Sequence, residues 1–260
     1  MYRYAGDVVG APVGVLGEAA LAAFDLAFSV NGTLVRRSLG VSWDMPFEAM
    51  DPVREFSWHK DSHGFAGWYY SSTMRDHVGY ESWLERDRLI LLDRDPHVVA
   101  IASQPFWLHW HDGTRKRRHA PDYFVRLSGG GARIVDVRAA DELDEVTEEA
   151  FDATGHACRA VGWEFEWAGR PELVFMANVR WLSRYRRARC ARPVSVADRL
   201  LEVFREPMGL WEGAGLVGDR LQVLPVLFHL LWSGALKTDL VGGLMETDSL
   251  VWTEGNSWAA

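Results

Sequence analysis

The segment from residue 120 to residue 139 constrains the fold of this chain more than any other part of the sequence. Residues 120–127 and 133–139 each form a short, largely apolar run of the kind that is typical of β-strands. Between them, residues 128–131 contain three glycines, which favour a reversal of the chain within a few residues. The sequence therefore predicts two strands joined by a tight turn in an antiparallel hairpin.

This hairpin brings charged residues together. Successive side chains alternate between the two faces of a strand, so Asp136 and Arg138 point to one side while Val135 and Val137 point to the other. Asp122 stands at the start of the preceding strand, at a separation that a hairpin spans easily. We therefore expect Asp122 to lie near Asp136, beside an apolar backing.

The central region contains further helix and strand patterns. Residues 75–92 and 141–161 repeat apolar side chains at helical spacing. Short apolar runs indicate additional strands at residues 97–102, 104–111, 163–167 and 173–177. Asn178 is predicted to cap a last helix that runs to a basic cluster. These elements predict an α/β fold in which helices flank a mixed central sheet.

Both ends of the chain differ from this central region. Residues 1–74 lack strong periodicity and indicate a small accessory region, in which residues 8–30 are interpreted as an amphipathic or buried helix. After residue 193, two helical patterns and two short strand patterns indicate a small, winged-helix-like C-terminal domain; they cover residues 196–204, 221–233, 237–241 and 250–253. We therefore expect three parts, residues 1–74, 75–192 and 193–260.

The charge of the chain limits how it can bind nucleic acid. Its formal net charge is -8, which argues against a protein that coats DNA through bulk electrostatics. Two basic runs stand out at residues 115–119 and 184–189, and each is equally compatible with a solvated loop or helix end. Contact with DNA is therefore expected to be local.

Cysteine usage and hydropathy indicate a cytoplasmic protein. The two cysteines, Cys158 and Cys190, are far apart and suit a reducing compartment. The N-terminus lacks a signal-peptide pattern, and Glu18 and Asp25 interrupt its most apolar stretch. We expect no membrane span.

Two carboxylates held close together favour a metal ion. They repel each other and raise each other's pKa unless a cation lies between them, and hard oxygen ligands select Mg²⁺ or Mn²⁺. Such an ion supports phosphodiester hydrolysis by polarising phosphoryl oxygens and activating water. Arg138 is the candidate for stabilising the developing charge.

The motifs resemble a known nuclease family. Pro121-Asp122 followed by Asp136-Val137-Arg138, with Glu81 on a preceding helix, looks like the PD-(D/E)xK signature of restriction-endonuclease-like folds. Four surrounding stretches, at residues 79–87, 103–106, 118–122 and 178–182, resemble the TnsA-like transposase endonucleases. The resemblance covers residues 78–189.

The resemblance implies a function and a set of site residues. Glu81, Asp122 and Asp136 would bind Mg²⁺, or Mn²⁺ in its place, together with the Val137 carbonyl, and Gln104 would lie nearby. Members of that family cut double-stranded DNA at the ends of a mobile element, beside a DDE transposase and an AAA+ regulator. A two-domain plan and a homodimer are compatible with it.

Arg138 departs from the family, which usually has Lys at this position. Arginine does not give up its proton near neutral pH, so Arg138 cannot act as a general base. Charge stabilisation survives the exchange, but activity can be weakened or lost. A catalytically silent DNA-binding subunit is therefore one alternative function, and a defence or restriction endonuclease is another.

Each candidate residue also has a purely structural interpretation. Glu81 and Glu85 could form a solvated helix face with Arg88, while Asp122 could be a turn residue and Asp136 a surface partner of Arg138. His109 and His111 share a strand face, but further zinc ligands do not occur at suitable spacing. Candidate substrate contacts are Gln104, Arg117, Arg118 and His119.

Overall fold

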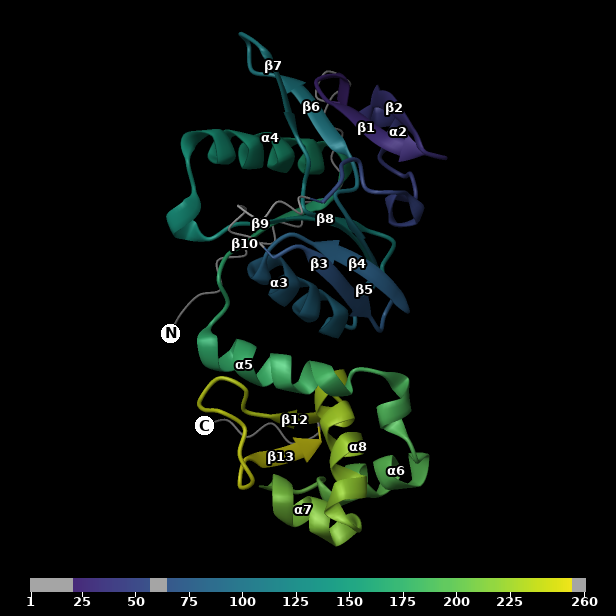
Figure 1. The fold of residues 1–260 in the computed structure, drawn as a ribbon, viewed down its shortest axis with the longest axis vertical. Helices are drawn as coiled ribbons and strands as arrows, with labels where there is room; N and C mark the ends of the chain where they lie inside the picture. The colour runs from purple at the N-terminus through teal and green to yellow at the C-terminus, as the bar shows by residue number, and fades with distance from the viewer. Residues whose placement is uncertain (1–20, 57–64, 254–260) are drawn as a thin grey trace. The chain divides into compact units, whose positions relative to one another are not determined.

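The computed structural model describes residues 21–56 and 65–253, and Figure 1 shows its ribbon. The chain divides into two compact units, Met1–Arg170 and Pro171–Ala260. This division differs from the boundaries that we predicted after residues 74 and 192. Helices and strands occur in both units, so the predicted mixture of α and β structure is confirmed.

A four-stranded sheet forms the centre of the first unit. Its strands follow the order β10 (Glu164–Ala168), β9 (Ala132–Val137), β8 (Tyr123–Leu127) and β5 (Val98–Ser103). The strands β8 and β9 form the antiparallel hairpin that the sequence predicts, whereas β9 and β10 are parallel. The central sheet is therefore mixed, as expected.

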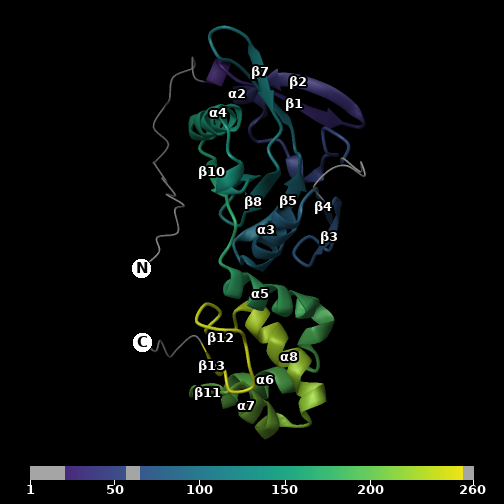
Figure 2. The ribbon, with the colours of Figure 1, turned by 60° about the vertical axis from the view of Figure 1, so that its left-hand side comes forward.

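Two helices pack on this sheet, and each begins after a capping residue. The helix α3 (Trp83–Arg94) follows Ser82, whose hydroxyl accepts a backbone hydrogen bond. The helix α4 (Glu145–Val161) follows the N-cap Asp144 and ends at Gly162, whose φ of 75° is left-handed and suits glycine. The two helices lie on opposite sides of the sheet (Figure 1, Figure 2).

A second sheet joins the N-terminal segment to the central region. Its strands follow the order β2 (Thr33–Ser38), β1 (Asp25–Val30), β6 (Trp107–His111) and β7 (Lys116–His119). The helix predicted for residues 8–30 is wrong from residue 25 onward, and residues 8–20 lie outside the described part of the chain. Asn31 and Gly32 have φ values of 51° and 75°, as a two-residue hairpin turn requires. This turn outweighs the apolar pattern that suggested a helix.

A separate hairpin precedes α3. It consists of β3 (Gly67–Ser71) and β4 (Asp76–Tyr80), which pair antiparallel. The helix predicted for residues 75–92 is therefore wrong over its first part. The reason is the cap at Ser82, which fixes the start of the helix, so the residues before it are free to pair as a strand.

Asp93 connects α3 to this hairpin. Its buried carboxylate accepts hydrogen bonds from the hydroxyls of Tyr69 and Ser71 and from the amides of Ser72 and Thr73, over 2.7–3.1 Å. An acceptor-only side chain matches these four donors. The last turn of α3 is thus attached to the connection between β3 and β4.

Replacing Asp93 with Asn is expected to destabilise the protein by about 2–3 kcal/mol, because an amide NH₂ would face donors that a carboxylate accepts. Thermal unfolding should show the melting temperature lowered by roughly 4–10 °C. The exposed Asp76, in the same hairpin, supplies the control Asp76→Asn, which should change it little. Equal melting temperatures for the two variants would contradict this account.

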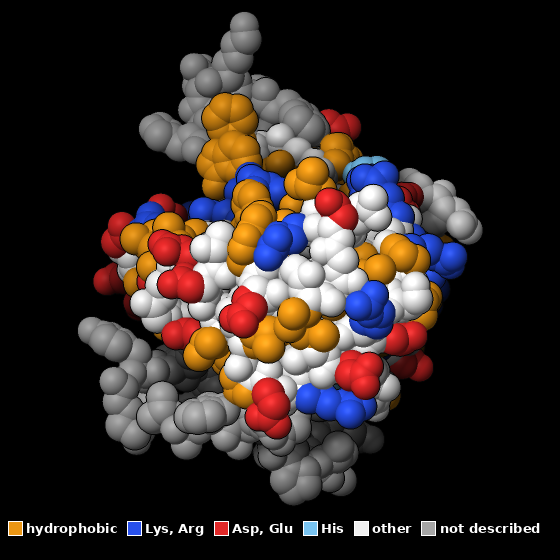
Figure 3. Space-filling view, turned by 90° about the horizontal axis from the view of Figure 1, so that it is seen from below, with side chains coloured by type: hydrophobic (Ala, Val, Ile, Leu, Met, Phe, Trp, Pro, Cys, Tyr) orange, Lys and Arg blue, Asp and Glu red, His pale blue; other side chains and the backbone are white. Residues whose placement is uncertain are grey.

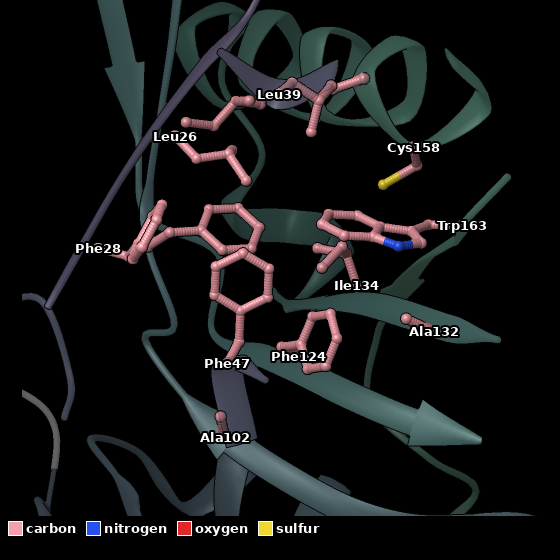
Figure 4. Packing of buried hydrophobic residues seen from close by; sticks show 13 residues of the cluster. Leu26, Phe28, Leu39, Phe47, Ala102, Phe124, Ala132, Ile134, Cys158 and Trp163 are labelled. Carbon is pink, nitrogen blue, oxygen red and sulfur yellow. The ribbon is translucent and has the colours of Figure 1, made fainter. Parts of the chain in front are cut away.

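An aromatic cluster fills the core of the first unit. Phe47, in the short helix η1 (Phe47–Ala49), makes edge contacts with four rings at centroid distances of 5.0–6.0 Å. These rings belong to Phe28, Phe106, Phe124 and Trp163, and Figure 4 shows the Phe47 ring among Phe28, Phe124 and Trp163. The short helix α2 (Leu39–Ser42) adds Leu39 to the same cluster. Residues before position 74 are therefore part of this core.

The second unit combines helices with a small sheet. Its elements are α5 (Leu173–Leu182), η3 (Ser183–Tyr185), η4 (Ala188–Ala191), α6 (Val194–Val203), β11 (Met208–Gly209), α7 (Leu210–Val217), α8 (Arg220–Ser233), β12 (Leu236–Thr238) and β13 (Leu250–Thr253). The sheet has the order β11-β13-β12. The predicted helices at 196–204 and 221–233 and the strand at 250–253 are present, whereas α7 was not predicted.

The start of α5 corrects another prediction. Residues 173–177 form the first part of this helix, not a strand, because the Glu172 carboxylate accepts hydrogen bonds from the Val174 and Phe175 amides and caps it. Asn178, the predicted cap, lies inside the helix. Its side-chain amide donates to the Leu240 and Gly243 carbonyls, so it holds the loop after β12 instead.

No individual helix among the described residues has the length and apolar content needed to cross a membrane. The helices α7 and α8 reach that level only as a pair, with a bend of 119° between them.

Candidate active site

Asp122 and Asp136 lie side by side at one end of the β8–β9 hairpin. Tyr123 is opposite Val135 in the sheet register, so the next position brings the two acids together. The Asp122 amide donates to Asp136 Oδ1 over 3.2 Å, and Asp122 Oδ2 accepts from the Val137 amide over 2.7 Å. The proximity that the hairpin predicted is therefore confirmed.

His119 contacts the second of these acids. Its Nε2 lies 2.9 Å and 3.0 Å from the two carboxylate oxygens of Asp136, which is buried. The imidazole edge packs against Phe151 of α4, at a centroid distance of 6.2 Å. Since His119 ends β7, this contact attaches the second sheet to the carboxylates of the central sheet.

The electrostatic environment of Asp122 is unfavourable for a charged carboxylate. Burial raises its pKa well above the ordinary value, and the negative charges of Asp136 and Glu85 raise it further. The hydrogen bond from Val137 and the positive charge of Arg54 act in the opposite direction but are smaller. The carboxylates of Asp122, Asp136 and Glu85 therefore repel one another, and the hydrogen bond from Val137 and the charge of Arg54 offset this repulsion only in part.

We predicted that Glu81 lies on a helix, and this prediction is wrong. Glu81 occupies the connection between β4 and α3, and its two carboxylate oxygens accept hydrogen bonds from the Arg54 guanidinium over 2.9 Å and 2.5 Å. Sequence reasoning missed Arg54, because no local pattern indicates a partner so far along the chain. This two-bond ion pair occupies both carboxylate oxygens of Glu81 and places the Arg54 guanidinium beside the cluster of acidic residues.

Glu85 is the acid that sequence reasoning underestimated. Its carboxylate accepts hydrogen bonds from the Glu81 amide and the Ser82 hydroxyl, and its backbone amide donates to Ser82 Oγ, so these residues hold the start of α3 in a variant of the capping box. Burial raises its pKa, although the two hydrogen bonds that the carboxylate accepts lower it in part. The charge of Glu85 also acts on Asp122 and on the buried Tyr123. The spacing Ser-x-x-Glu was the available signal, and it also marks an ordinary helix start.

Gln104 lies behind Asp122. The backbone amide of Gln104 donates to the Asp122 backbone carbonyl over 2.8 Å, and the backbone carbonyl of Gln104 accepts from the Val53 amide. Its φ of 47° is in the left-handed region, and only 2% of the residue is exposed. Within the described chain, the buried side-chain Oε1 of Gln104 has no hydrogen-bond partner. A buried amide oxygen in this state is costly unless a ligand satisfies it.

Arg138 follows the end of β9 and is exposed. Its amide donates to the Ala168 carbonyl, and its own carbonyl accepts from the Trp167 indole. The described part of the chain contains no ion pair within 4.0 Å between Arg138 and Asp122 or Asp136. Hydrogen bonds from Thr147 lower the pKa of Asp144, and the positive charge of Arg138 lowers it further. Of the predicted catalytic residues, Arg138 is thus the least engaged with the acids.

The basic run at residues 115–119 is mostly strand β7. Arg117 is neutralised by Asp112 and Glu149, at 2.8 Å and 2.7 Å. The Arg118 guanidinium lies over the Trp107 ring, 4.3 Å from its centroid. Of these two predicted substrate contacts, Arg117 is already paired within the protein.

The site offers oxygen donors of the kind that a hard divalent cation prefers. Asp122, Asp136 and Glu85 contribute carboxylates whose charges repel, and Gln104 contributes an unsatisfied amide oxygen. Across residues 21–56 and 65–253, however, no three His, Cys, Asp or Glu side chains already form a metal-binding group. Two predicted ligands are engaged elsewhere, Asp136 with His119 and Glu81 with Arg54. The donor chemistry fits a metal, whereas the arrangement would have to adjust.

Comparison with known proteins identifies part of this region. Residues 95–168 match the family model described as TnsA-like endonuclease N terminal. The match includes Gln104, Asp122 and Asp136, and it begins after Glu81 and Glu85. No curated protein matches the chain.

Proposed function

Since residues 95–168 match the TnsA-like endonuclease N-terminal family, we propose that this chain is a metal-dependent DNA endonuclease subunit of a TnsA-like transposition system. It would hydrolyse phosphodiester bonds at the ends of a mobile element. The observation that carries the proposal is the pair formed by Asp122 and Asp136, in which burial and neighbouring acids raise the pKa of Asp122. Buried carboxylates that repel each other lower the stability of the fold, whereas a bound metal ion would make their proximity favourable.

The acids are proposed to hold Mg²⁺, for which Mn²⁺ can substitute. Asp122 and Asp136 are two of the ligands, and the third acid is Glu81, as the family resemblance implies, or Glu85, which the electrostatics favour. The Val137 carbonyl remains a proposed further ligand. A bound ion would polarise the phosphoryl oxygens and lower the pKa of the attacking water.

The neighbouring residues support this group in distinct ways. His119 hydrogen-bonds Asp136 and would fix the orientation of its carboxylate. Gln104 is proposed to place its free Oε1 toward the substrate or its water. Arg138 is exposed and would approach the substrate phosphate only when DNA is bound, where it would stabilise developing charge but not accept a proton.

The second unit is proposed to be a winged-helix-like domain. The chain runs through α6, β11, α7, α8, β12 and β13, and β13 lies between the other two strands, which is the order of helices and wing strands that such domains have. The proposed partners are double-stranded DNA, a DDE transposase and an AAA+ regulator. Partners that already hold DNA would offset the weak affinity of an acidic chain.

Metal-dependent cutting of DNA tests the proposed function. The purified chain, alone and with its transposase and ATPase partners, is incubated with supercoiled plasmid in Mg²⁺, Mn²⁺ or EDTA. We expect nicked or linear product only with metal, and a loss of roughly 100-fold or more in Asp136→Asn. The exposed Asp198 provides the control Asp198→Asn, which should cut normally. Absence of metal-dependent product in every combination would contradict the proposal.

A catalytically silent assembly subunit is the second candidate, and the exposed Arg138 in place of Lys favours it. In the same assay, Arg138→Lys separates the two candidates. An active nuclease should keep or increase its rate in this variant, because a point charge replaces a planar fork. A silent subunit should remain inactive with both residues while still binding DNA.

A further inference from the structure

A short segment of the second unit is rich in arginine and contains no acid. Residues 180–192, here called the arginine segment, include Arg180, Arg184, Arg186, Arg187, Arg189 and Arg192. The segment covers the end of α5, η3, η4 and the residue after them. In a chain whose net charge is -8, it concentrates positive charge in one place.

Three exposed arginines of this segment form no ion pair among the described residues, as is also true of Arg37 and Arg75 in the first unit, but here the three lie within residues 184–192. Other exposed arginines of the first unit are paired, since Arg36 and Arg170 form ion pairs with Asp25 and Asp141. By contrast, no carboxylate in the described residues lies within 4.0 Å of Arg184, Arg189 or Arg192, all of which are exposed. Their charge is therefore available to an external anion without breaking an ion pair.

Aromatic packing gives the segment a fixed surface. The Arg184 guanidinium lies over the Trp181 ring, 4.7 Å from its centroid. Trp181 and Tyr185 both pack against Phe228 of α8, at 6.0 Å and 4.8 Å. His229 adds a contact of 2.7 Å from its Nδ1 to the Tyr185 carbonyl. The backbone that carries these arginines is thus attached to the core of the second unit.

Other surfaces of the second unit suit a polyanion poorly. The loop between β12 and β13 carries Asp239, Glu246 and Asp248, whose negative charge would repel phosphate. On the face shown in Figure 3, acidic, basic and apolar side chains are interspersed, without a continuous basic surface. The other basic residues of this unit in the described range, Arg199, Arg205, Arg220 and Lys237, are spread along the chain, so the arginine segment holds the highest density of positive charge in its sequence.

We propose that the arginine segment binds the sugar-phosphate backbone of duplex DNA through Arg184, Arg189 and Arg192. This proposal rests on the proposed function, because it assigns a binding surface to the same substrate. Guanidinium groups suit phosphate because they donate two parallel hydrogen bonds, and arginine keeps its charge at any physiological pH. Phosphate contacts position a protein on DNA without reading sequence.

Binding without cutting tests this surface. Fluorescence anisotropy is measured with the full chain in EDTA and a labelled 30-base-pair duplex, from about 20 to 200 mM salt. The variant with Arg184→Gln, Arg189→Gln and Arg192→Gln should lose roughly 10- to 100-fold in affinity, and the slope of log K against log salt should fall by about 2–3. A matched control carries Arg37→Gln, Arg75→Gln and Arg199→Gln at exposed positions, with the same change in charge, and should lose much less.

Two further measurements separate the possible outcomes. Substituting Lys at the same three arginines keeps the charge and should restore most of the affinity, whereas a folding defect would not be repaired in this way. Equal losses in the variant and the matched control would overturn the proposal, as would unchanged DNA binding with a loss of binding to polyglutamate, which would indicate an acidic protein partner. Plasmid cutting is scored separately, so an inactive protein that still binds DNA through these arginines would refute only the proposed catalysis.

Discussion

The Asp122→Asn variant is expected to lose cutting by roughly 100-fold or more and, without metal, to be more stable than the wild type. Both effects have one cause, because the carboxylate lies against Asp136 and feels Glu85. Asparagine keeps an oxygen that can accept from the Val137 amide but removes a negative charge that is costly to bury. Activity measurements and thermal unfolding in EDTA would record the two effects.

The stability difference between Asp122→Asn and the wild type should depend on pH, and the pKa shift of Asp122 determines its direction. Because the folded state raises the pKa of Asp122, it holds the proton more tightly than the unfolded chain does. The free energy of unfolding of the wild type should therefore decrease as pH rises above about 4, where the unfolded carboxylate ionises, until the folded group has also ionised. The Asn variant should lack this part of the decrease, and its advantage should be largest at the upper end of that range.

The exposed carboxyl of Asp198 is again the reference, since Asp198→Asn should alter neither cutting nor stability in EDTA. A less stable Asp122→Asn protein would show that the Asp122 carboxylate serves the fold. Our account of the acidic pair would then be wrong.

The Glu85→Gln and Glu81→Gln variants form a matched pair with different expected results. We expect Glu85→Gln to lose cutting by roughly 100-fold or more. The charge of Glu85 acts on Asp122, so the two carboxylates are close enough in our proposal to bind one metal ion, and the variant would lose a ligand. Glu81→Gln removes one partner of the Arg54 fork and should lose less activity but more stability. Rates at saturating metal, metal titrations and melting temperatures distinguish them.

Glutamine at position 85 can still accept from the Ser82 hydroxyl, and its backbone amide still donates to Ser82 Oγ, so the cap of α3 should survive even though the Glu81 amide loses its acceptor. A large loss of cutting in Glu81→Gln with normal cutting in Glu85→Gln would return the third-ligand role to Glu81. Equal, small losses in both variants would mean that neither acid binds the metal.

Local patterns predicted the elements that depend on neighbouring residues. The β8–β9 hairpin followed from its glycine turn, α4 from its apolar repeat, and the approach of Asp122 to Asp136 from the hairpin itself. In each case a few consecutive residues hold the physical information, because a turn or a helix closes its hydrogen bonds within a short stretch of chain.

Distant pairing explains what could not be predicted. The strand β1 lies between β2 and β6, and nothing near residue 25 indicates that Trp107 and its neighbours will be its partners. The fork between Arg54 and Glu81 and the contact of His119 with Asp136 likewise join separate segments. Side-chain capping by Glu172 was available in the sequence, but the apolar run after it resembled a strand equally well.

The position of Phe47 bears on how this protein can be subdivided. A fragment trimmed to the family match at residues 95–168 would keep Phe106, Phe124 and Trp163 but lose both Phe28 and the ring that inserts among them. Three large rings would then meet water where they now meet Phe47. The residues that match the family model and the residues that complete the core are therefore different sets, and a fragment that keeps this core must begin before Phe28.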